Sequence, residues 1–400
     1  MRTYRELAHV PEFRPLFGNA AAHVAGMTVS GLALGTLVYD RTRSPLLSAL
    51  SMFGPSLAQM LGATMLLSAA DRLPPRATTT GIELVYAAGT AALAIPGMPL
   101  GGMFAVIVVL GVVGSVGGGV RYGLLTEVLP KEGYLLGRSV LNMSAGTMQI
   151  CGYGAGGVLV LALGERGTLL AGAGLYLLAA AASRFGLTRR PPRASGRPSV
   201  AATWRTNRLL WSSRPRRYVY LALWVPNGLV VGCESLFVSY EPRHAGVLFA
   251  AAAAGMLTGD IIGGRFVPKG RRTRLGVPML ILLAAPYLIF ALQPPLYLAA
   301  AIAGVSSVGF CASLMQQERL MNLTPEELSG HAFGLHASGM LTMQAVGAGL
   351  AGVIAERTSP GTAMAVMAAA SLAVTASLAR GLSLSSSPRI APGTVMSDSR

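Results

Sequence analysis

A few ionisable side chains interrupt the long apolar stretches of this sequence. His23 and Glu234 stand well inside two of those stretches, and Glu83 stands near the end of a third. An ionisable group within a membrane span is costly, so it is a candidate functional residue by default. A desolvated carboxylate and an imidazole can each gain and lose a proton near neutral pH. We therefore predict Glu234 first, and His23 second, as proton-exchanging residues. The alternatives are a carboxylate that stays in interfacial water and a histidine hydrogen-bonded between helices.

Two glutamines occupy matching places in an internal repeat. The stretches TMQICGYGAGGVL (147–159) and TMQAVGAGLAGVI (342–354) share Thr, Met, Gln, three glycines and a valine at a constant offset of 195. Gln149 and Gln344 fall near the middle of their apolar stretches. Amides there either bind a neutral, polar-decorated ligand or hydrogen-bond helix to helix. Arg121 and Trp224 are further candidates for lining the same cavity.

The sequence offers no constellation for covalent or metal chemistry. Its five histidines are dispersed, and no serine stands in a nucleophile elbow. Cys151, Cys233 and Cys311 each lie in an apolar run without the spacing of a metal site or a disulfide framework. We therefore expect no enzymatic activity, no cofactor and no bound metal.

The composition predicts an all-helical membrane protein. Charged residues make up 12% of the chain, against roughly 25% in soluble domains. One helix needs about 20 apolar residues to cross a bilayer. Twelve stretches qualify, at about 17–39, 46–70, 78–96, 99–121, 138–163, 168–187, 217–239, 245–264, 275–292, 295–315, 332–355 and 360–380.

The twelve stretches fall into two groups of six. We predict a first half at 1–187, a basic linker at 188–216, a second half at 217–380 and a disordered tail at 381–400. Parallel repeats of this kind are typical of transporters with a site between the halves.

The distribution of the basic residues predicts the orientation of the chain. The net charge is +16, but aromatic residues are only 6% of the chain, so we expect no nucleic-acid partner. With both termini inside, 27 of the 32 Lys and Arg residues fall in inner segments and 5 in outer ones. We therefore place both termini in the cytoplasm. Because 30 of the 32 are Arg, the composition suggests a GC-rich bacterial genome and a plasma-membrane location.

Together with the twelve spans and the basic linker, one loop resembles a motif of the major facilitator superfamily. Between the second and third spans, that family carries a signature like G-x-L-A-D-R-x-G-R-[KR]. The stretch SAADRLPPR keeps Asp71, Arg72 and Arg76 and departs from the signature at Ser68 and at Pro74–Pro75. GDIIGGRFVPKGRRTR (259–274) occupies the equivalent loop of the second half. The resemblance implies a gating role for Asp71, Arg72 and Arg76, and for Asp260 and Arg265 in the second copy.

The fifth span resembles the antiporter motif G-P-x-x-G-G of the same superfamily. The stretch GYGAGG supplies Gly152, Gly156 and Gly157, with Tyr153 in place of the proline. Two further stretches are similar to the drug and siderophore exporter branch of this superfamily: RYGLLTEVLPKEGYLLGRSVLNMSAG (121–146) and TLVYDRTRSP (36–45).

The resemblance implies a transporter that works by alternating access of its two halves. We expect a monomer in the lipid bilayer that exports a small organic molecule resembling a drug, siderophore or natural product, in exchange for protons. An importer or facilitator of a small metabolite is the alternative within transport. A non-transporting membrane scaffold or sensor is the alternative from another class.

Overall fold

The computed structural model describes residues 6–7, 9–65, 73–192, 200–325 and 328–384, and every regular element in them is a helix. The first half contains α2 (Phe13–Thr42), α3 (Pro45–Met65), α5 (Pro75–Leu93), α6 (Leu100–Val128) and α7 (Lys131–Gly186). Helix α7 contains two spans, because Gly164 at its middle has φ 69° and ψ 175°, which turns the chain back. Glycine adopts this positive φ without steric cost.

The second half begins after a short helix, α8 (Val200–Ser212), in the predicted linker. Its helices are α9 (Arg214–Ser235), α10 (Phe237–Tyr240), α11 (Ala245–Ile261), η1 (Ile262–Phe266), α12 (Lys269–Ala284), η2 (Ala285–Leu292), α13 (Leu296–Val308), η3 (Gly309–Cys311), α14 (Ala312–Asn322), α15 (Ser329–Arg357) and α16 (Pro360–Leu384). Each short element extends a neighbouring helix: α10 extends α9, η1 extends α11, η2 extends α12, and η3 with α14 extends α13. This half therefore also contains six spans.

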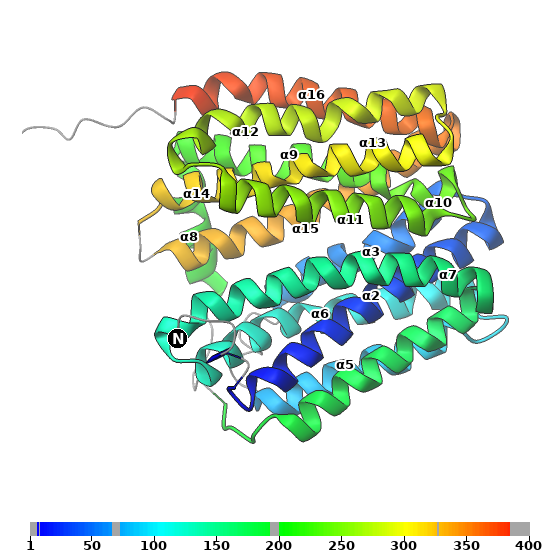
Figure 1. The fold of residues 1–400 in the computed structure, drawn as a ribbon, viewed down its shortest axis with the longest axis vertical. Coiled ribbons are helices and arrows are strands. Elements are labelled where there is room, and N and C mark those ends of the chain that lie inside the picture. Colours follow the sequence, from blue (N-terminus) through cyan, green and yellow to red (C-terminus); the bar gives the residue numbers. More distant parts are fainter. Residues whose placement is uncertain (1–5, 8, 66–72, 193–199, 326–327, 385–400) are drawn as a thin grey trace, which may run out of the picture.

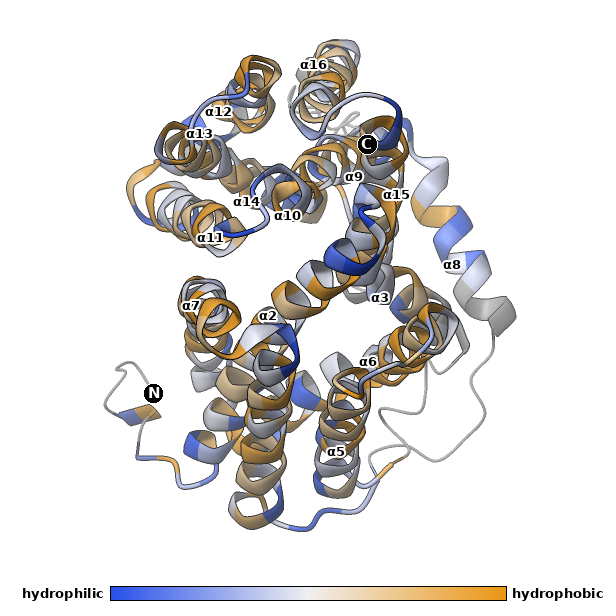
Figure 2. Ribbon diagram, turned by 90° about the vertical axis from the view of Figure 1, so that its right-hand side faces the viewer, coloured by the Kyte–Doolittle hydropathy of each residue, from blue (hydrophilic) through white to orange (hydrophobic). Residues whose placement is uncertain are grey.

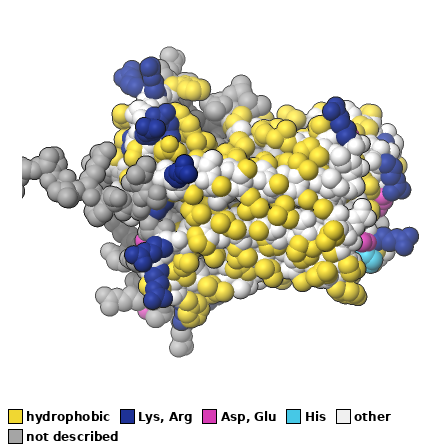
Figure 3. Space-filling model, turned by 90° about the horizontal axis from the view of Figure 1, so that it is seen from above, with side chains coloured by type: hydrophobic (Ala, Val, Ile, Leu, Met, Phe, Trp, Pro, Cys, Tyr) yellow, Lys and Arg dark blue, Asp and Glu magenta, His cyan; other side chains and the backbone are white. Residues whose placement is uncertain are grey.

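The lengths and composition of these helices make the chain a multi-pass membrane protein. Nine helical segments in the described residues are long and apolar enough to cross a bilayer. With α3, α5 and the second arm of α7, the described part of the chain contains twelve spans at the twelve predicted places. Figure 3 shows hydrophobic side chains over the middle of the visible face, and Lys and Arg at its two ends. Exposed apolar residues such as Val158, Leu161 and Leu178 need lipid around them.

The two halves lie side by side, with the first half below the second in Figure 1. We call the end that holds α8 and the start of α2 the linker end, and the opposite end, which holds the α2–α3 connection and α10, the distal end. The halves meet near the distal end and diverge toward the linker end (Figure 1). Viewed from the distal end in Figure 2, α8 lies beside α15 on the outside of the bundle, and it contacts α15 and α9.

The internal repeat makes the same contact in each half. A Cβ at Gly152 of α7 would collide with Thr28 of α2, and a Cβ at Gly347 of α15 would collide with the backbone of Gly228 in α9. Gly152 and Gly347 are 195 residues apart, and each allows a close helix crossing inside its own half. Gly156 also faces α2, where a Cβ would lie 3.4 Å from Cα of Val29.

The last glycine of the repeat joins one half to the other. A Cβ at Gly157 would lie 3.3 Å from Cα of Gly246 in α11, and a Cβ at Gly352 would lie 2.5 Å from Cα of Leu46 in α3. Ser44 also donates a hydrogen bond to Glu356 across the halves. The repeated motif therefore sets both the packing within each half and the distal contact between halves.

Candidate functional site

A cavity of about 430 Å³ lies between the two halves, and we call it the central cavity. Residues of α2, α3, α5, α6 and α7 line it from the first half, and residues of α9, α11 and α15 line it from the second. Its walls combine apolar side chains with neutral polar ones such as Thr28, Ser56, Gln59 and Thr90. The volume is in the range of sites for drug-sized molecules.

Among the described residues that line the central cavity, Glu234 is the one with an acidic or basic side chain. It lies in the distal part of α9, is 8% exposed, and accepts a hydrogen bond of 3.3 Å from Ser307 of α13. Beside it the cavity wall includes Tyr153 of α7 stacked on Phe249 of α11, with ring centroids 4.7 Å apart. The motif position that departs from proline therefore supplies an aromatic contact between the halves. The proton-exchanging role of Glu234 stays a prediction.

Both repeat glutamines line the central cavity. Gln344 also donates a hydrogen bond of 3.1 Å from its Nε2 to Oδ1 of Asn227 in α9. The amide of Gln344 therefore hydrogen-bonds helix to helix while it lines the cavity, and its binding of a ligand stays a prediction. Its counterpart Gln149 faces the cavity from the opposite half.

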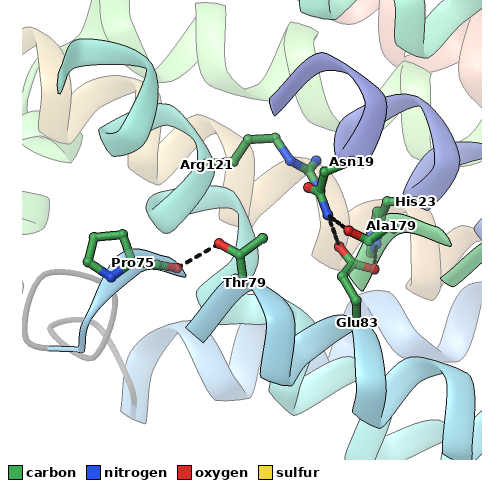
Figure 4. Close-up of polar contacts among 7 residues, drawn as sticks. All are labelled: Asn19, His23, Pro75, Thr79, Glu83, Arg121 and Ala179. Carbon is green, nitrogen blue, oxygen red and sulfur yellow. Dashed lines mark hydrogen bonds and ion pairs between the residues drawn. The ribbon is translucent and has the colours of Figure 1, made fainter. Parts of the chain in front are cut away.

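His23 lies inside the first half, among polar side chains from three helices. Its Nδ1 is 2.9 Å from Oε2 of Glu83, a residue of α5 that is 1% exposed. Oε1 of Glu83 accepts a hydrogen bond of 3.1 Å from Asn19 and lies 4.0 Å from a guanidinium nitrogen of Arg121. We call Asn19, His23, Glu83 and Arg121 the N-half site (Figure 4). The sequence marked Glu83 only as an acid near a span end, and it gave no sign of Asn19.

Arg121 borders a second cavity of about 40 Å³, which it shares with His23 and Glu83. It is not among the residues that line the central cavity, so the structure places this substrate candidate in the N-half site instead. Its guanidinium can hold a carboxylate charge inside an apolar half, which a lone Glu83 could not keep without cost.

Trp224 also lies outside the central-cavity lining. Its indole N–H donates to the carbonyl of His336 at 3.1 Å, and its ring stacks on Trp211 of α8 with centroids 5.6 Å apart and planes 7° apart. The structure therefore gives Trp224 a packing role at the linker helix instead of the predicted place in the cavity wall.

Those predicted gating residues that the structure describes lie at the linker end. Arg76 lies in the first turn of α5, while Asp71 and Arg72 lie outside the described residues. Asp260 is exposed on α11, and Arg265 is exposed in the η1 turn that follows. Neither the gating role nor the charge relay between these copies is tested by these positions.

The fold and its cavity define a secondary-transporter architecture, in which two parallel repeats enclose a site near the middle of the bilayer. Residues 16–318 match the sequence profile of the Major Facilitator Superfamily, and the chain belongs to this family. No curated protein matches the sequence. The family and the fold indicate a transporter and not an enzyme.

Several solved transporters have the same fold. The chain is similar to a mutant of the nucleoside transporter NupG, with a TM-score of 0.76, 13% identity, and coverage of 92% of this chain and 99% of that one. It is similar to a POT family transporter in complex with a thioalcohol-conjugated peptide, with a TM-score of 0.74, 11% identity, and coverage of 94% and 96%. A bacterial homologue of the human lysosomal transporter Spinster, inward-facing and unoccupied, has a TM-score of 0.67, 12% identity, and coverage of 96% of both chains. At these identities the likeness concerns the fold alone.

Proposed function

We propose that this protein is a secondary transporter that exports a small amphipathic organic molecule in exchange for protons. The observation that carries the proposal is the placement of Glu234 as the single charged side chain of the central cavity. A carboxylate in an otherwise neutral, apolar cavity binds either a proton or the polar part of a substrate. Competition between the two couples proton entry to substrate release.

The chemistry of the cavity wall supports an amphipathic organic substrate. Met27, Met52 and Met256 supply adaptable apolar contact, and the amides of Gln149 and Gln344 supply donors and acceptors from opposite halves. A molecule with an apolar body and a few polar groups satisfies both. Drug-like compounds, siderophores and natural products all include molecules of this kind.

The distribution of charge supports an orientation with the linker end in the cytoplasm. The segments assigned to that side by the sequence contain 27 of the 32 basic residues, which is the bias expected of cytoplasmic loops. In that orientation both termini are cytoplasmic, and the halves diverge toward the cytoplasm of a bacterial cell (Figure 1). Substrate would enter the central cavity from this side of the plasma membrane.

Rocking of the halves would then carry substrate outward. The distal contacts at Gly157 and Gly352 open, while Arg76, Asp260 and Arg265 close the linker end together with Asp71 and Arg72. One chain encloses the whole cavity, so we propose that a monomer performs the cycle.

Transport of ethidium or of the neutral dye Nile red in proteoliposomes tests the proposal. The wild-type chain should move at least one dye against its gradient when the pH gradient is imposed, with protons and dye in opposite directions. Glu234→Gln should abolish the effect of the pH gradient. Glu241→Gln, which changes an acid between α10 and α11 outside the cavity lining, should leave it unchanged. Movement of protons and dye in the same direction would favour the importer, and wild-type transport of neither dye under either gradient would contradict the proposal.

A further inference from the structure

The N-half site is a buried polar site that is separate from the central cavity. Three helices of the first half build it, with Asn19 and His23 from α2, Glu83 from α5 and Arg121 from α6 (Figure 4). Asn19 is fully buried and Glu83 is 1% exposed. Glu234, the acid of the central cavity, belongs to the second half.

Groups from four helices face Glu83 in the described part of the chain. From α2 it is faced by His23 and by the amide of Asn19, and from α6 by Arg121 at 4.0 Å. Tyr176 of α7 and Tyr86 of α5 itself also interact with Glu83 electrostatically. Among these described groups Arg121 is the permanent cation, and its distance of 4.0 Å from Oε1 exceeds a direct hydrogen bond.

The small cavity offers room for one water molecule between these groups. Its volume of about 40 Å³ exceeds the roughly 10–15 Å³ that a cavity needs to hold one water, and its wall includes His23, Glu83 and Arg121. A water there would have enough polar partners and would bridge the gap between Glu83 and the guanidinium. Oδ1 of Asn19 is buried and has no hydrogen-bond partner among the described residues. This acceptor can receive a proton donor that reaches the site.

Two tyrosines connect the N-half site with the central cavity. The rings of Tyr86 and Tyr176 pack on the ring of His23, with centroids 5.3 and 5.6 Å away, and on each other at 5.1 Å. Both tyrosines also line the central cavity, and the Tyr86 hydroxyl hydrogen-bonds Gln59 of its wall. The two packed rings therefore connect His23 with the central cavity.

We propose that Glu83 is a second proton-binding site, loaded through a water held between Glu83 and Arg121. A hydronium ion transfers its proton to Oε1, so that an O–H bond forms on Glu83 and a neutral water remains. Oε2 keeps its hydrogen bond with His23, and the amide of Asn19, which can donate or accept, serves both protonation states. Protonation removes the attraction between α5 and α6 at Arg121. The tyrosine pair transmits the resulting shift to the central cavity.

This proposal rests on proton coupling in the proposed function, but it is tested without transport. Infrared spectra of the purified full chain, recorded over a pH titration, report protonated carboxyl groups by their C=O stretch. We expect that one of the carboxyl bands of the wild type is absent in Glu83→Gln and is retained in Glu234→Gln. If the bands of protonated carboxyl groups coincide in the wild type and Glu83→Gln over the whole titration, the proposal is overturned. A Glu83 band in a protein that fails to transport either dye would contradict the proposed function and leave the site standing.

Two further variants protect the test against misfolding of Glu83→Gln. His23→Gln keeps a hydrogen-bonding group beside Oε2 but removes the ring, and should shift the frequency of the Glu83 C=O stretch, because the hydrogen bond to the carboxyl group changes. Thr79→Val is the matched control, because Thr79 borders the same cavity while its hydroxyl already donates to the carbonyl of Pro75. It should leave the band at its wild-type frequency. A band that does not move in His23→Gln, or that moves equally in both variants, would show that Glu83 is a static structural acid.

Discussion

Gly157 of α7 packs against Gly246 of α11, so the two halves touch backbone to backbone near the distal end. A Cβ at Gly246 would lie only 2.8 Å from both Cα of Gly157 and the carbonyl oxygen of Tyr153. Helices approach this closely only where neither carries a side chain. The contact therefore stabilises the arrangement in which the distal ends of the halves are together.

A larger side chain at Gly157 should separate the halves at the distal end. Gly157→Leu is expected to lengthen the distance between spin labels at positions 43 and 357, in a chain whose three cysteines are replaced, by about 2 Å, because interaxial distance follows the side chains at a contact. Gly154→Leu is the matched control, since a Cβ at Gly154 meets nothing within 4 Å. Equal distances in both variants would show that Gly157 does not set the distal contact.

Replacement of the two repeat glutamines should separate substrate binding from helix packing. Gln149→Leu is expected to weaken ethidium binding, measured by fluorescence, with little change in the midpoint of thermal unfolding. Gln344→Leu should weaken binding and also destabilise the chain by about 1–3 kcal/mol, because Asn227 loses its donor. Equal unfolding midpoints for the two variants would argue that the Asn227 bond contributes nothing to stability.

The sequence predicted the spans because length and apolarity decide what crosses a bilayer. Even the bend within α7 falls between two predicted stretches, at Gly164. Helix α8 was not predicted, because its sequence is basic and follows prolines. Its docking depends on Trp211, which packs against Tyr220 and Trp224 of α9. Contacts between two helices cannot be read from the sequence pattern of one of them.

The sequence predicted the central cavity residues better than the N-half site. Gln149, Gln344 and Glu234 could be placed near the cavity by depth and repeat position. The partners of Glu83 come from two other helices, at least 38 positions away along the chain. A helix that is apolar on every side, such as α6, does not indicate which face turns inward. For this reason the sequence did not place Arg121 beside Glu83.

An ion-pair network outside the membrane spans should make stability depend on pH. Glu12 precedes α2 and accepts hydrogen bonds from Arg190, at 2.6 Å, and from Thr188, at 2.9 Å. Burial alone would raise the pKa of Glu12, but these hydrogen bonds and the Arg190 charge lower it overall. A lowered pKa in the folded state stabilises the fold above the unfolded value of about 4.3, and this contribution is lost as the pH falls through the folded pKa.

Glu12→Gln should therefore lower the thermal unfolding midpoint at pH 7 and have a much smaller effect at pH 3. Differential scanning fluorimetry of the purified protein measures both. Glu165→Gln, near the bend of α7 at the distal end, is the matched change of an acid and should have little effect at either pH. A Glu12→Gln effect of equal size at both pH values would mean that the ionised carboxylate is not the stabilising form.

The stack of Trp211 on Trp224 should hold α8 against the second half. Trp211→Ala removes this stack and the contact with Tyr220, and an aromatic pair contributes about 1 kcal/mol beyond its buried area. Limited trypsin digestion after Arg205 and Arg208 should then proceed about fivefold faster, because 1 kcal/mol changes the population of the undocked helix by about that factor. Trp204→Ala is the matched control, since Trp204 is 69% exposed on the same helix and should leave the rate unchanged. If both changes accelerate cleavage equally, the tryptophans stabilise helix α8 itself and not its packing against the second half.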